Sequence, residues 1–496
     1  MKLHELIAQK LAQDPNRLCM EFEDHSLTRG QFASLCDAAT EALKKAGFGK
    51  GMRLLTLLPN CPNLLALAMG VWRLGGALVP LTTALGDQLL GGAIQLVDPF
   101  AVVTTEEGAA LPLLQQLCAD KLNAVSPLAP ITDLKGSAAC RIDSQEFALL
   151  FATSGTTGLP KAVPLTHENI IDNIRGTAEH VYLEEDDDLK VLNVLPNHHT
   201  FGFCVSGLLP LVLGYAQRML PHFLPPKRVL DALYGGGVSV LIAVPTLYGM
   251  LAEGILKAGL PHPPHLKHVI CGGSATPQRI YDRTKQALGV DLHEGYGLTE
   301  CSPIVASVRL ASDGCAGKIG PFFKSFEHQL RDLEGKPIEG NEGVLWVKGP
   351  SVCHGYYLSS EVDNSRFDGP WFNTGDVVRL NEDGTMSILD RTNDLIIVSG
   401  FNVYPQEVEN KMSAHPAIAE CVAVGAKNPL SGEVVVLYVV KAEGAEVSEK
   451  ELLAYAKENL ANYKAPRAIR FVDELPRNAM GKPLRRVIRD MERSRG

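Results

Sequence analysis

A run of small residues, four of them hydroxylated, is the stretch of this sequence best suited to hold an anion. Glycines let the main chain approach a ligand and expose its N–H groups, while serine and threonine hydroxyls add donors. Lys161 follows the run after Leu159 and Pro160. The residues of the run are Thr153, Ser154, Gly155, Thr156, Thr157 and Gly158. This pattern predicts a loop that wraps phosphate groups.

The run differs from the phosphate loop (Walker A motif) of the P-loop nucleoside triphosphatases. That motif ends in Gly-Lys-Ser/Thr at the start of a helix, and the helix N-terminus holds the phosphates. Here Leu159 and Pro160 separate Gly158 from Lys161, and Pro164 prevents an immediate regular helix. Taken alone, the run is also compatible with an ordinary turn after the apolar stretch 147–151.

Further polar side chains stand beside glycines later in the chain. They lie in Cys271–Ala275, which includes Gly273, Ser274 and Ala275; in Glu294–Glu300, which includes Gly295, Tyr296, Gly297 and Thr299; in Thr374–Asp376; in Ser399–Glu409, which includes Gly400; and in Pro476–Lys482. Taken alone, a segment such as Cys271–Ala275 is also compatible with a plain glycine turn. The interpretation therefore depends on the order of the segments along the chain.

In this order, the segments resemble the motifs of the adenylate-forming superfamily, which contains acyl- and aryl-CoA ligases, nonribosomal peptide adenylation domains and luciferases. The resemblance covers essentially the whole chain. The Ser399–Pro405 sequence looks most like fatty acyl-CoA ligases. The resemblance implies ATP, Mg²⁺ and CoA as the small molecules that the protein uses.

The resemblance also implies a role for each matched residue of the first 300. The run 153–158 and Lys161 would hold phosphate, and Gly273–Ala275 would form the adenine-side loop. Within Glu294–Gly297, Tyr296 would stack on adenine. Thr299 would contact phosphate, Glu300 would hold Mg²⁺, and His199 would line the acid pocket.

The remaining matches follow in the last 125 residues. Asp376 and Arg391 would reach the ribose, and Gly400 would enter the site for the second half-reaction. Lys482 matches the catalytic lysine. Asn393 occupies the hinge position, where relatives usually carry Lys or Asp, so the charge of the hinge is missing. Relatives also commonly read Pro-aliphatic-Phe before His199, whereas this chain has Asn197 and His198.

The implied reaction activates a carboxylic acid as an acyl-adenylate, releases pyrophosphate, and then transfers the acyl group to CoA with release of AMP. Thr200–Leu213 and Cys301–Val305 are apolar, so a medium- or long-chain fatty acid is expected. An aryl acid, loading of a carrier protein and β-lactone formation stay as alternatives. A catalytically inactive binder of nucleotide or fatty acid is a further alternative, which the presence of Lys482, Glu300 and Asp376 disfavours.

These residues must be positioned by strands that alternate with helices. Such alternation, as in 51–80, predicts an α/β fold with largely parallel, covered sheets. Short strands with Gly/Asp turns from 343 to 389 predict a small β-rich subdomain, and the last hundred residues predict a mobile α+β domain. We place the boundary near Arg391, which gives an N-terminal adenylation domain, 1–390, and a C-terminal domain, 391–496.

Composition supports a globular cytoplasmic protein. The chain has 496 residues and a net charge of −9, which disfavours a nucleic-acid surface. The eleven cysteines form no C-x-x-C pair, and we find no signal peptide, so a reducing compartment is expected. The uncharged stretch Thr200–Gln217 contains Pro210 and three glycines, so a buried helix or pocket wall is expected rather than a membrane span. The expected assembly is a monomer or a homodimer.

Overall fold

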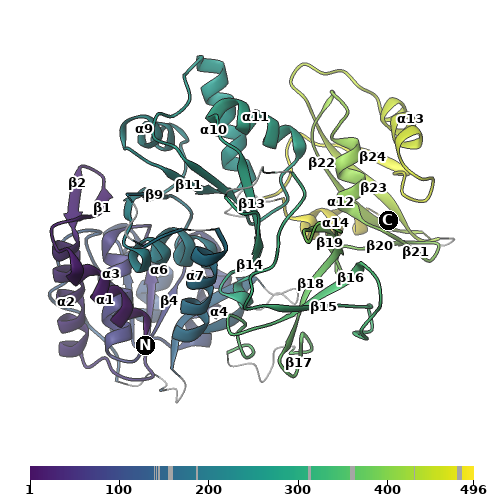
Figure 1. Cartoon of the computed structure of the whole chain (residues 1–496). Coiled ribbons are helices and arrows are strands. Elements are labelled where there is room, and N and C mark those ends of the chain that lie inside the picture. The colour runs from purple at the N-terminus through teal and green to yellow at the C-terminus, as the bar shows by residue number, and fades with distance from the viewer. Residues whose placement is uncertain are drawn as a thin grey trace. The chain divides into compact units, whose positions relative to one another are not determined.

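The computed structural model describes residues 1–495 apart from 139, 141, 143–145, 155–159, 182, 186–187, 311–313, 315, 358–363, 429–430 and 478–482. Two compact units make up the chain (Figure 1). The first contains Met1–Glu327 and Val347–Phe372, and the second contains His328–Trp346 and Asn373–Gly496. The mixed α/β class predicted from the sequence is confirmed, while the boundary near Arg391 stays a prediction.

A six-stranded sheet lies in the first unit, in the order β6-β5-β3-β4-β7-β8. All neighbours are parallel except β7 and β8, which form an antiparallel pair. The strands are β3 Arg53–Leu57, β4 Ala77–Pro80, β5 Ala101–Thr104, β6 Leu122–Ala124, β7 Phe147–Ser154 and β8 Pro160–Thr166. The strands β3, β4 and β5 are buried along their whole length, as the alternation of strands with helices predicts.

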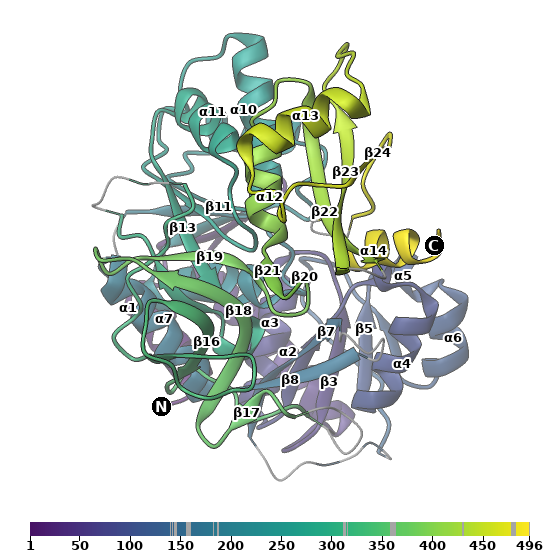
Figure 2. The same ribbon diagram turned by 90° about the vertical axis from the view of Figure 1, so that its right-hand side faces the viewer.

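Helices cover both faces of this sheet (Figure 2). On one face, α4 (Asp87–Val97) and α6 (Pro112–Cys118) pack against Leu55, Val79 and Val102. On the other, α3 (Pro62–Arg73) contacts β3 and β4 and packs against α2 (Arg29–Ala46). The remaining short helices here are η1 Thr83–Leu85 and α5 Glu106–Ala109.

The ends of α2 follow directly from its sequence. The Thr28 hydroxyl accepts from the backbone N–H of Gln31, and the Gln31 side chain accepts from the N–H of Thr28, which forms a capping box. Gly47 ends the helix with φ 95°, in the left-handed region that favours glycine.

An eight-stranded sheet forms the rest of the first unit's core, in the order β14-β13-β12-β11-β9-β10-β1-β2. Its six central strands are parallel and its two edge strands are antiparallel. The strands are β1 Leu18–Phe22, β2 His25–Thr28, β9 Lys190–Asn193, β10 Ala216–Met219, β11 Val240–Ala243, β12 His268–Cys271, β13 Leu292–Gly297 and β14 Ile304–Ser307. The helices around it are α1 Leu3–Gln13, α7 His167–Val181, α8 Leu209–Leu213, α9 Lys227–Gly235, α10 Pro245–Ala258 and α11 Gln278–Leu288.

The apolar stretch 200–217 is a pocket wall. Phe201–Leu208 forms a π-helix, η2, which continues into α8 and is almost entirely buried. Across the described residues, no helix is both long and apolar enough to cross a bilayer.

The second unit contains two sheets. In the first, β15 (Glu327–Arg331), β16 (Glu342–Lys348) and β18 (Trp371–Leu380) are neighbours, and β19 (Met386–Arg391) pairs with β18. At its start, β18 also pairs with β17 (Phe367–Asp368). In the second sheet the order is β21-β20-β23-β22, with β24 beside β23. These strands are β20 Ile396–Val398, β21 Phe401–Val403, β22 Ile418–Asn428, β23 Gly432–Lys441 and β24 Ala468–Phe471.

Helices cover both faces of the second sheet as well. The apolar faces of α12 (Pro405–Met412) and α13 (Glu449–Asn459) join one core cluster with the strands. Ile488 of α14 (Arg485–Arg493) joins a second cluster with Val422, Val436 and Tyr438.

Candidate active site

The hydroxyl-rich run begins at the carboxyl end of β7. Strand β7 ends at Ser154, β8 begins at Pro160, and Thr153 is the register partner of Lys161. The run therefore joins two antiparallel strands, and no helix follows it directly, as Pro164 predicts. Gly155, Thr156, Thr157 and Gly158 lie outside the described residues, as does Lys482, so their roles stay predictions.

An apolar cavity of about 90 Å³ lies along one face of the eight-stranded sheet. Four of the predicted nucleotide-side residues line it, together with the π-helix and the strands β9, β11, β12, β13 and β14. The predicted ones are Gly273, Gly295, Tyr296 and Gly297; among the others are Phe201, Val205, Val240, Ile242, Ile270 and Ser307. Among the described residues, no lysine or arginine lines the cavity.

Gly297, in the lining of this cavity, leaves no room for a side chain. A Cβ on Gly297 would lie 2.0 Å from the Pro303 carbonyl oxygen, and a Cβ on Gly272 would lie 3.1 Å from the Phe201 ring. Gly273 has φ 86°. The loop Gly273–Ala275 is therefore held with its backbone partly exposed beside the cavity.

Glu294 holds that loop in place. One carboxylate oxygen, Oε1, accepts from the backbone N–H of Thr276 at 3.0 Å, and Oε2 accepts from that of Gly317 at 2.9 Å. The side chain is buried, and burial raises the pKa of Glu294. With both oxygens bonded to the main chain, this carboxylate positions the loop that the sequence predicts to face adenine.

Glu300 lies in the short helix η3 (Thr299–Cys301) and is 6% exposed. Its Oε1 accepts from the Tyr356 hydroxyl at 2.9 Å and from Nη1 of Arg366 at 3.1 Å. Burial, followed by the negative charge of Glu300, raises the pKa of Tyr356, which therefore stays a neutral donor.

Two backbone attachments fix the position of η3. The Asn173 amide on α7 donates to the carbonyl oxygens of Cys301 and Ile304 at 3.1 and 2.7 Å, and its Oδ1 accepts from the Ile304 N–H at 3.1 Å. The backbone N–H of Cys353 donates to the Glu300 carbonyl at 2.8 Å. Glu300 is thus anchored from α7 and from the segment 347–372.

The predicted Mg²⁺ ligand suits a divalent cation. In the described part of the chain, no residue bonds to the second oxygen of Glu300, Oε2, while Oε1 is held in place by two donors. A buried, oriented carboxylate with one oxygen left for a ligand is a suitable donor for a hard cation. Glu300 would hold Mg²⁺ there.

His199 follows a turn that buried amides hold. The backbone N–H of Asn197 donates to Asn60 Oδ1 at 2.8 Å, and Asn60 Nδ2 donates to the Leu195 carbonyl at 2.9 Å. The Asn197 and Asn193 side chains bond to each other at 3.0 Å, and Asn193 Nδ2 donates to Gln217 at 2.9 Å. Asn197, which differs from the relatives' aliphatic residue, belongs to this amide network.

Both histidines of the turn are neutral near pH 7. Burial lowers the pKa of His199, and burial followed by the charges of His199 and His222 lowers that of His198 to about 3. The rings lie 4.6 Å apart between centroids. The chemistry expected of His199 is therefore contact with an uncharged part of a substrate.

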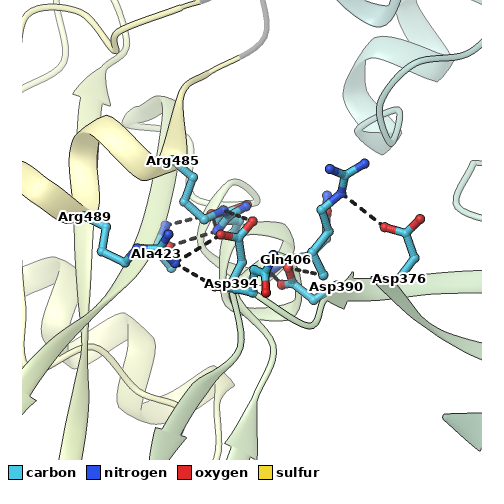
Figure 3. Close-up of polar contacts among 10 residues, drawn as sticks. Asp376, Asp390, Asp394, Gln406, Ala423, Arg485 and Arg489 are labelled. Atoms are coloured by element: carbon cyan, nitrogen blue, oxygen red, sulfur yellow. Dashed lines mark hydrogen bonds and ion pairs between the residues drawn. The ribbon is translucent and has the colours of Figure 1, made fainter. Parts of the chain in front are cut away.

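In the second unit, the two predicted ribose residues meet. Asp376 on β18 and Arg391 on β19 are register partners, and Arg391 Nε lies 3.1 Å from Asp376 Oδ1 (Figure 3). The Asp376 side chain is 4% exposed, whereas the Arg391 side chain is 58% exposed. The arrangement orients a carboxylate and leaves more than half of the Arg391 side chain exposed.

The predicted hinge segment, Asp390–Asp394, is tied to α14 (Figure 3). Arg489 Nη1 donates to the Asn393 carbonyl at 2.7 Å and lies 3.3 Å from Asp394 Oδ1. Arg485 lies 3.6 Å from Asp394 Oδ2 and 2.6 Å from Glu409 Oε1. The charge that the sequence lacks at position 393 is present on the next residue, Asp394.

Several residues of this site carry no signal in the sequence. Arg366 and Tyr356 bond to Glu300 from 66 and 56 positions away, and neither belongs to a segment that the sequence singled out. Asn60 and Asn173 are single polar residues in apolar surroundings, which is a weak hint of a buried hydrogen-bonding role.

Comparison with known proteins agrees with this geometry. The family model of the AMP-binding enzymes matches residues 7–357, and the model of their C-terminal domain matches residues 407–482. The chain belongs to the AMP-binding enzyme family. This confirms the predicted membership in the adenylate-forming superfamily and the prediction of an enzyme of the AMP-forming CoA ligase class.

Individual relatives differ in their acid substrates. A long-chain-fatty-acid–CoA ligase of Bacillus subtilis is 29% identical over 99% of this chain and 94% of its own length. A 2-succinylbenzoate–CoA ligase of Bacillus cereus is 30% identical over 98% of both chains. Among solved structures, ATP-bound MatB from Rhodopseudomonas palustris has a TM-score of 0.88 at 27% identity and 99% coverage of both chains.

Proposed function

We propose that this protein is an ATP-dependent carboxylate–CoA ligase for an apolar monocarboxylic acid, with a medium- or long-chain fatty acid as the preferred substrate. The observation that carries the acid class is the apolar cavity beside Gly295–Gly297 and the Gly272–Gly273 turn. Its walls include aliphatic side chains of the parallel strands β9, β11 and β12, namely Val191, Val240, Ile242 and Ile270. Burying an alkyl chain there is favourable by about 0.8 kcal/mol per methylene.

Charge argues against a second carboxylate on the acid. A dicarboxylate such as 2-succinylbenzoate would bury an anion in this cavity, which is costly without a cationic partner. In the part of the chain that the structure describes, the lining contains no lysine or arginine, and its polar side chains include Thr177, Ser307 and His293. The alkyl chain of a fatty acid ends in a methyl group, so burying it carries no such cost.

The lining residues extend along the sheet. Val240 and Cys271 both line the cavity, and Cys271 is the register partner of Ala243, three residues beyond Val240. At about 3.3 Å per residue the two positions are roughly 10 Å apart along the strands. A lining of this length is compatible with an extended alkyl chain. An aryl acid is the second candidate, because ring-binding relatives share the fold.

The reaction follows from the leaving group. A carboxylate is a poor acylating agent, so its oxygen attacks the α-phosphorus of ATP; the bond from that phosphorus to the bridging oxygen breaks and pyrophosphate leaves with the electron pair. The thiolate of CoA then attacks the acyl carbon, and AMP leaves. Mg²⁺ would supply positive charge for the first step, and the run 153–158 and Lys482 would supply donors and a cation. Loading of a carrier protein and β-lactone closure are alternatives for the second step.

A ladder of acids tests the proposal. The protein is incubated with ATP, Mg²⁺ and straight-chain or aromatic acids, with and without CoA, and AMP and thioester are measured by mass. CoA-dependent AMP with one class of acid supports the ligase. Pyrophosphate release that CoA does not change would point to a carrier protein or an internal hydroxyl. No AMP or pyrophosphate with any acid would favour a binding protein.

A further inference from the structure

The cation that pairs with Glu300 lies outside all the nucleotide motifs. Arg366 Nη1 is 3.1 Å from Glu300 Oε1, and 3.3 Å from the Tyr356 hydroxyl that bonds to the same oxygen. Within the described residues, Arg366 provides the one ion pair of Glu300. The side chain of Glu300 is 8% exposed, so solvent and salt reach the Glu300 carboxylate little and weaken this ion pair less than an exposed one.

The guanidinium of Arg366 is held in place. Its Cζ lies 4.5 Å from the centroid of the Phe372 ring, a cation–π distance. Phe372 and Tyr356 both contact Phe367, with ring centroids 5.1 and 5.6 Å apart. An arginine fixed by an aromatic face and a carboxylate is pre-organised, which reduces the entropy lost when it binds an anion.

Arg366 is also accessible. Its side chain is 29% exposed, in contrast to its partner Glu300. A planar guanidinium presents five N–H donors in a geometry that matches phosphate oxygens. A cation beside the carboxylate that would hold Mg²⁺ is therefore suited to contact the phosphates of a nucleotide that binds there.

We propose that Arg366 binds the β- and γ-phosphates of ATP and stabilises the pyrophosphate leaving group during adenylation. The inference rests on the proposed ATP-dependent function. When the bond between the α-phosphorus and the bridging oxygen breaks, its electron pair stays on pyrophosphate and the negative charge there grows. A fixed cation at this position is worth most at that moment. Acyl-adenylate and AMP lack these phosphates, so Arg366 has no such role in the CoA step.

A purely structural role predicts a different result. If Arg366 only neutralised the buried carboxylate of Glu300, removing it would destabilise the fold and weaken both half-reactions alike. The two roles can be distinguished by comparing a ligand that contains the β- and γ-phosphates with ligands that lack them.

The experiment compares Arg366→Gln and Arg366→Lys with the wild type. Binding of ATP with Mg²⁺ and of AMP is measured by calorimetry, and CoA transfer is measured from a synthetic acyl-adenylate. We expect Arg366→Gln to bind ATP about 10- to 100-fold more weakly, with AMP binding and CoA transfer within about two-fold of the wild type. Arg366→Lys should recover part of the loss. The matched control is Arg379→Gln, which breaks an exposed pair with Glu342 and should change none of these values.

A pair of further variants keeps the test decisive if Arg366→Gln folds poorly. In Glu300→Gln the buried charge is gone, so adding Arg366→Gln leaves no unpaired carboxylate. A further loss of ATP affinity in the double variant supports the direct phosphate contact. The inference is overturned if Glu300→Gln and the double variant bind ATP with equal affinity. It is also overturned if Arg366→Gln loses ATP binding and CoA transfer to the same extent. A wild type that binds no ATP overturns the proposed function itself.

Discussion

The backbone N–H of Asn197 donates to the side-chain oxygen of Asn60 at 2.8 Å. This hydrogen bond connects two segments, each of which follows a strand of a different sheet. Asn60 follows β3 of the six-stranded sheet, whereas Asn197 follows β9 of the eight-stranded sheet. Both residues are at most 2% exposed. The turn that carries His199 is therefore positioned by the sheet that leads to the phosphate run.

Asn60→Leu should destabilise the first unit. The substitution leaves the buried N–H of Asn197 and carbonyl of Leu195 without this partner, and each such loss costs about 1–3 kcal/mol. We expect the urea midpoint of unfolding to fall by an amount equivalent to about 2 kcal/mol or more. Asn16→Leu, at an exposed position, is the control and should leave the midpoint nearly unchanged. An unchanged midpoint in Asn60→Leu would show that water replaces the amide.

His167 should make stability dependent on pH. Its Nδ1 accepts from the backbone N–H of Leu3 at 3.4 Å, and burial, followed by the charges of His4 and Lys2, lowers its pKa to about 4. Glu146 and Glu5 oppose this shift. Because the unfolded chain takes up a proton near pH 6.5 and the folded chain does not, stability is lost as the pH falls from about 6.5 towards 4.

The size of this effect can be measured with His167→Gln. Each pH unit in that range costs about 1.4 kcal/mol at one such histidine. Between pH 7 and pH 5 the wild type should lose about 2 kcal/mol more unfolding free energy than the variant. Urea titrations at the two pH values provide the comparison, and parallel losses in both proteins would contradict the assignment.

Asp376→Asn should weaken every ligand that contains the ribose. The buried carboxylate is oriented by Arg391, and removing its charge leaves a poorer acceptor for sugar hydroxyls. We expect ATP and AMP to bind about ten-fold more weakly, in equal measure. This differs from Arg366→Gln, which should affect ATP alone. Calorimetry with both nucleotides distinguishes the variants, and unaltered AMP binding in Asp376→Asn would argue against a ribose contact.

Lys482→Ala should separate the two half-reactions. Adenylation should fall at least about 10²–10³-fold, as is typical when an electrostatic stabiliser is lost. Transfer of a supplied acyl-adenylate to CoA should continue, because no pyrophosphate is formed in that step and AMP is the leaving group. Pyrophosphate release and thioester formation are measured separately. Equal loss of both activities would contradict a division of labour between Lys482 and the Gly400 loop.

Val240→Phe should shorten the acids that the enzyme accepts. Val240 lines the cavity, and a phenyl ring there would fill part of its volume of about 90 Å³. We expect the longest acid that is turned over to lose several carbons, while kcat/KM for the shortest substrates stays within about three-fold, equivalent to less than 1 kcal/mol. The short acids are the internal control. A uniform loss at all lengths would indicate misfolding or a different acid pocket.

Sequence reasoning was strongest where chemistry is local. The motif order indicated the family. Proline and glycine at 164, 210 and 214 ruled out a P-loop helix and a membrane span. Each of these inferences depends on a few neighbouring residues whose backbone preferences are intrinsic.

The partners of the motif residues could not be obtained in this way. Glu300 is visible in the sequence, but Arg366 and Asn173, which hold its side chain and the turn after it, are 66 and 127 positions away from it. Asn393 shows the absence of a charge, but the pairing of Asp394 with Arg485 and Arg489 depends on how α14 returns to the second sheet.

The sequence by itself determined the family, the class of reaction and the identity of the residues expected to meet the nucleotide, because these reside in short motifs. Only the tertiary structure decided which apolar residues line a common cavity, that no lysine or arginine among the described residues lines it, and which buried polar groups satisfy one another. The physical reason is that packing and hydrogen bonding are set by distance in space. Residues such as Val240, Ser307 and Arg366 acquire their roles only when strands and loops far apart in the chain lie side by side.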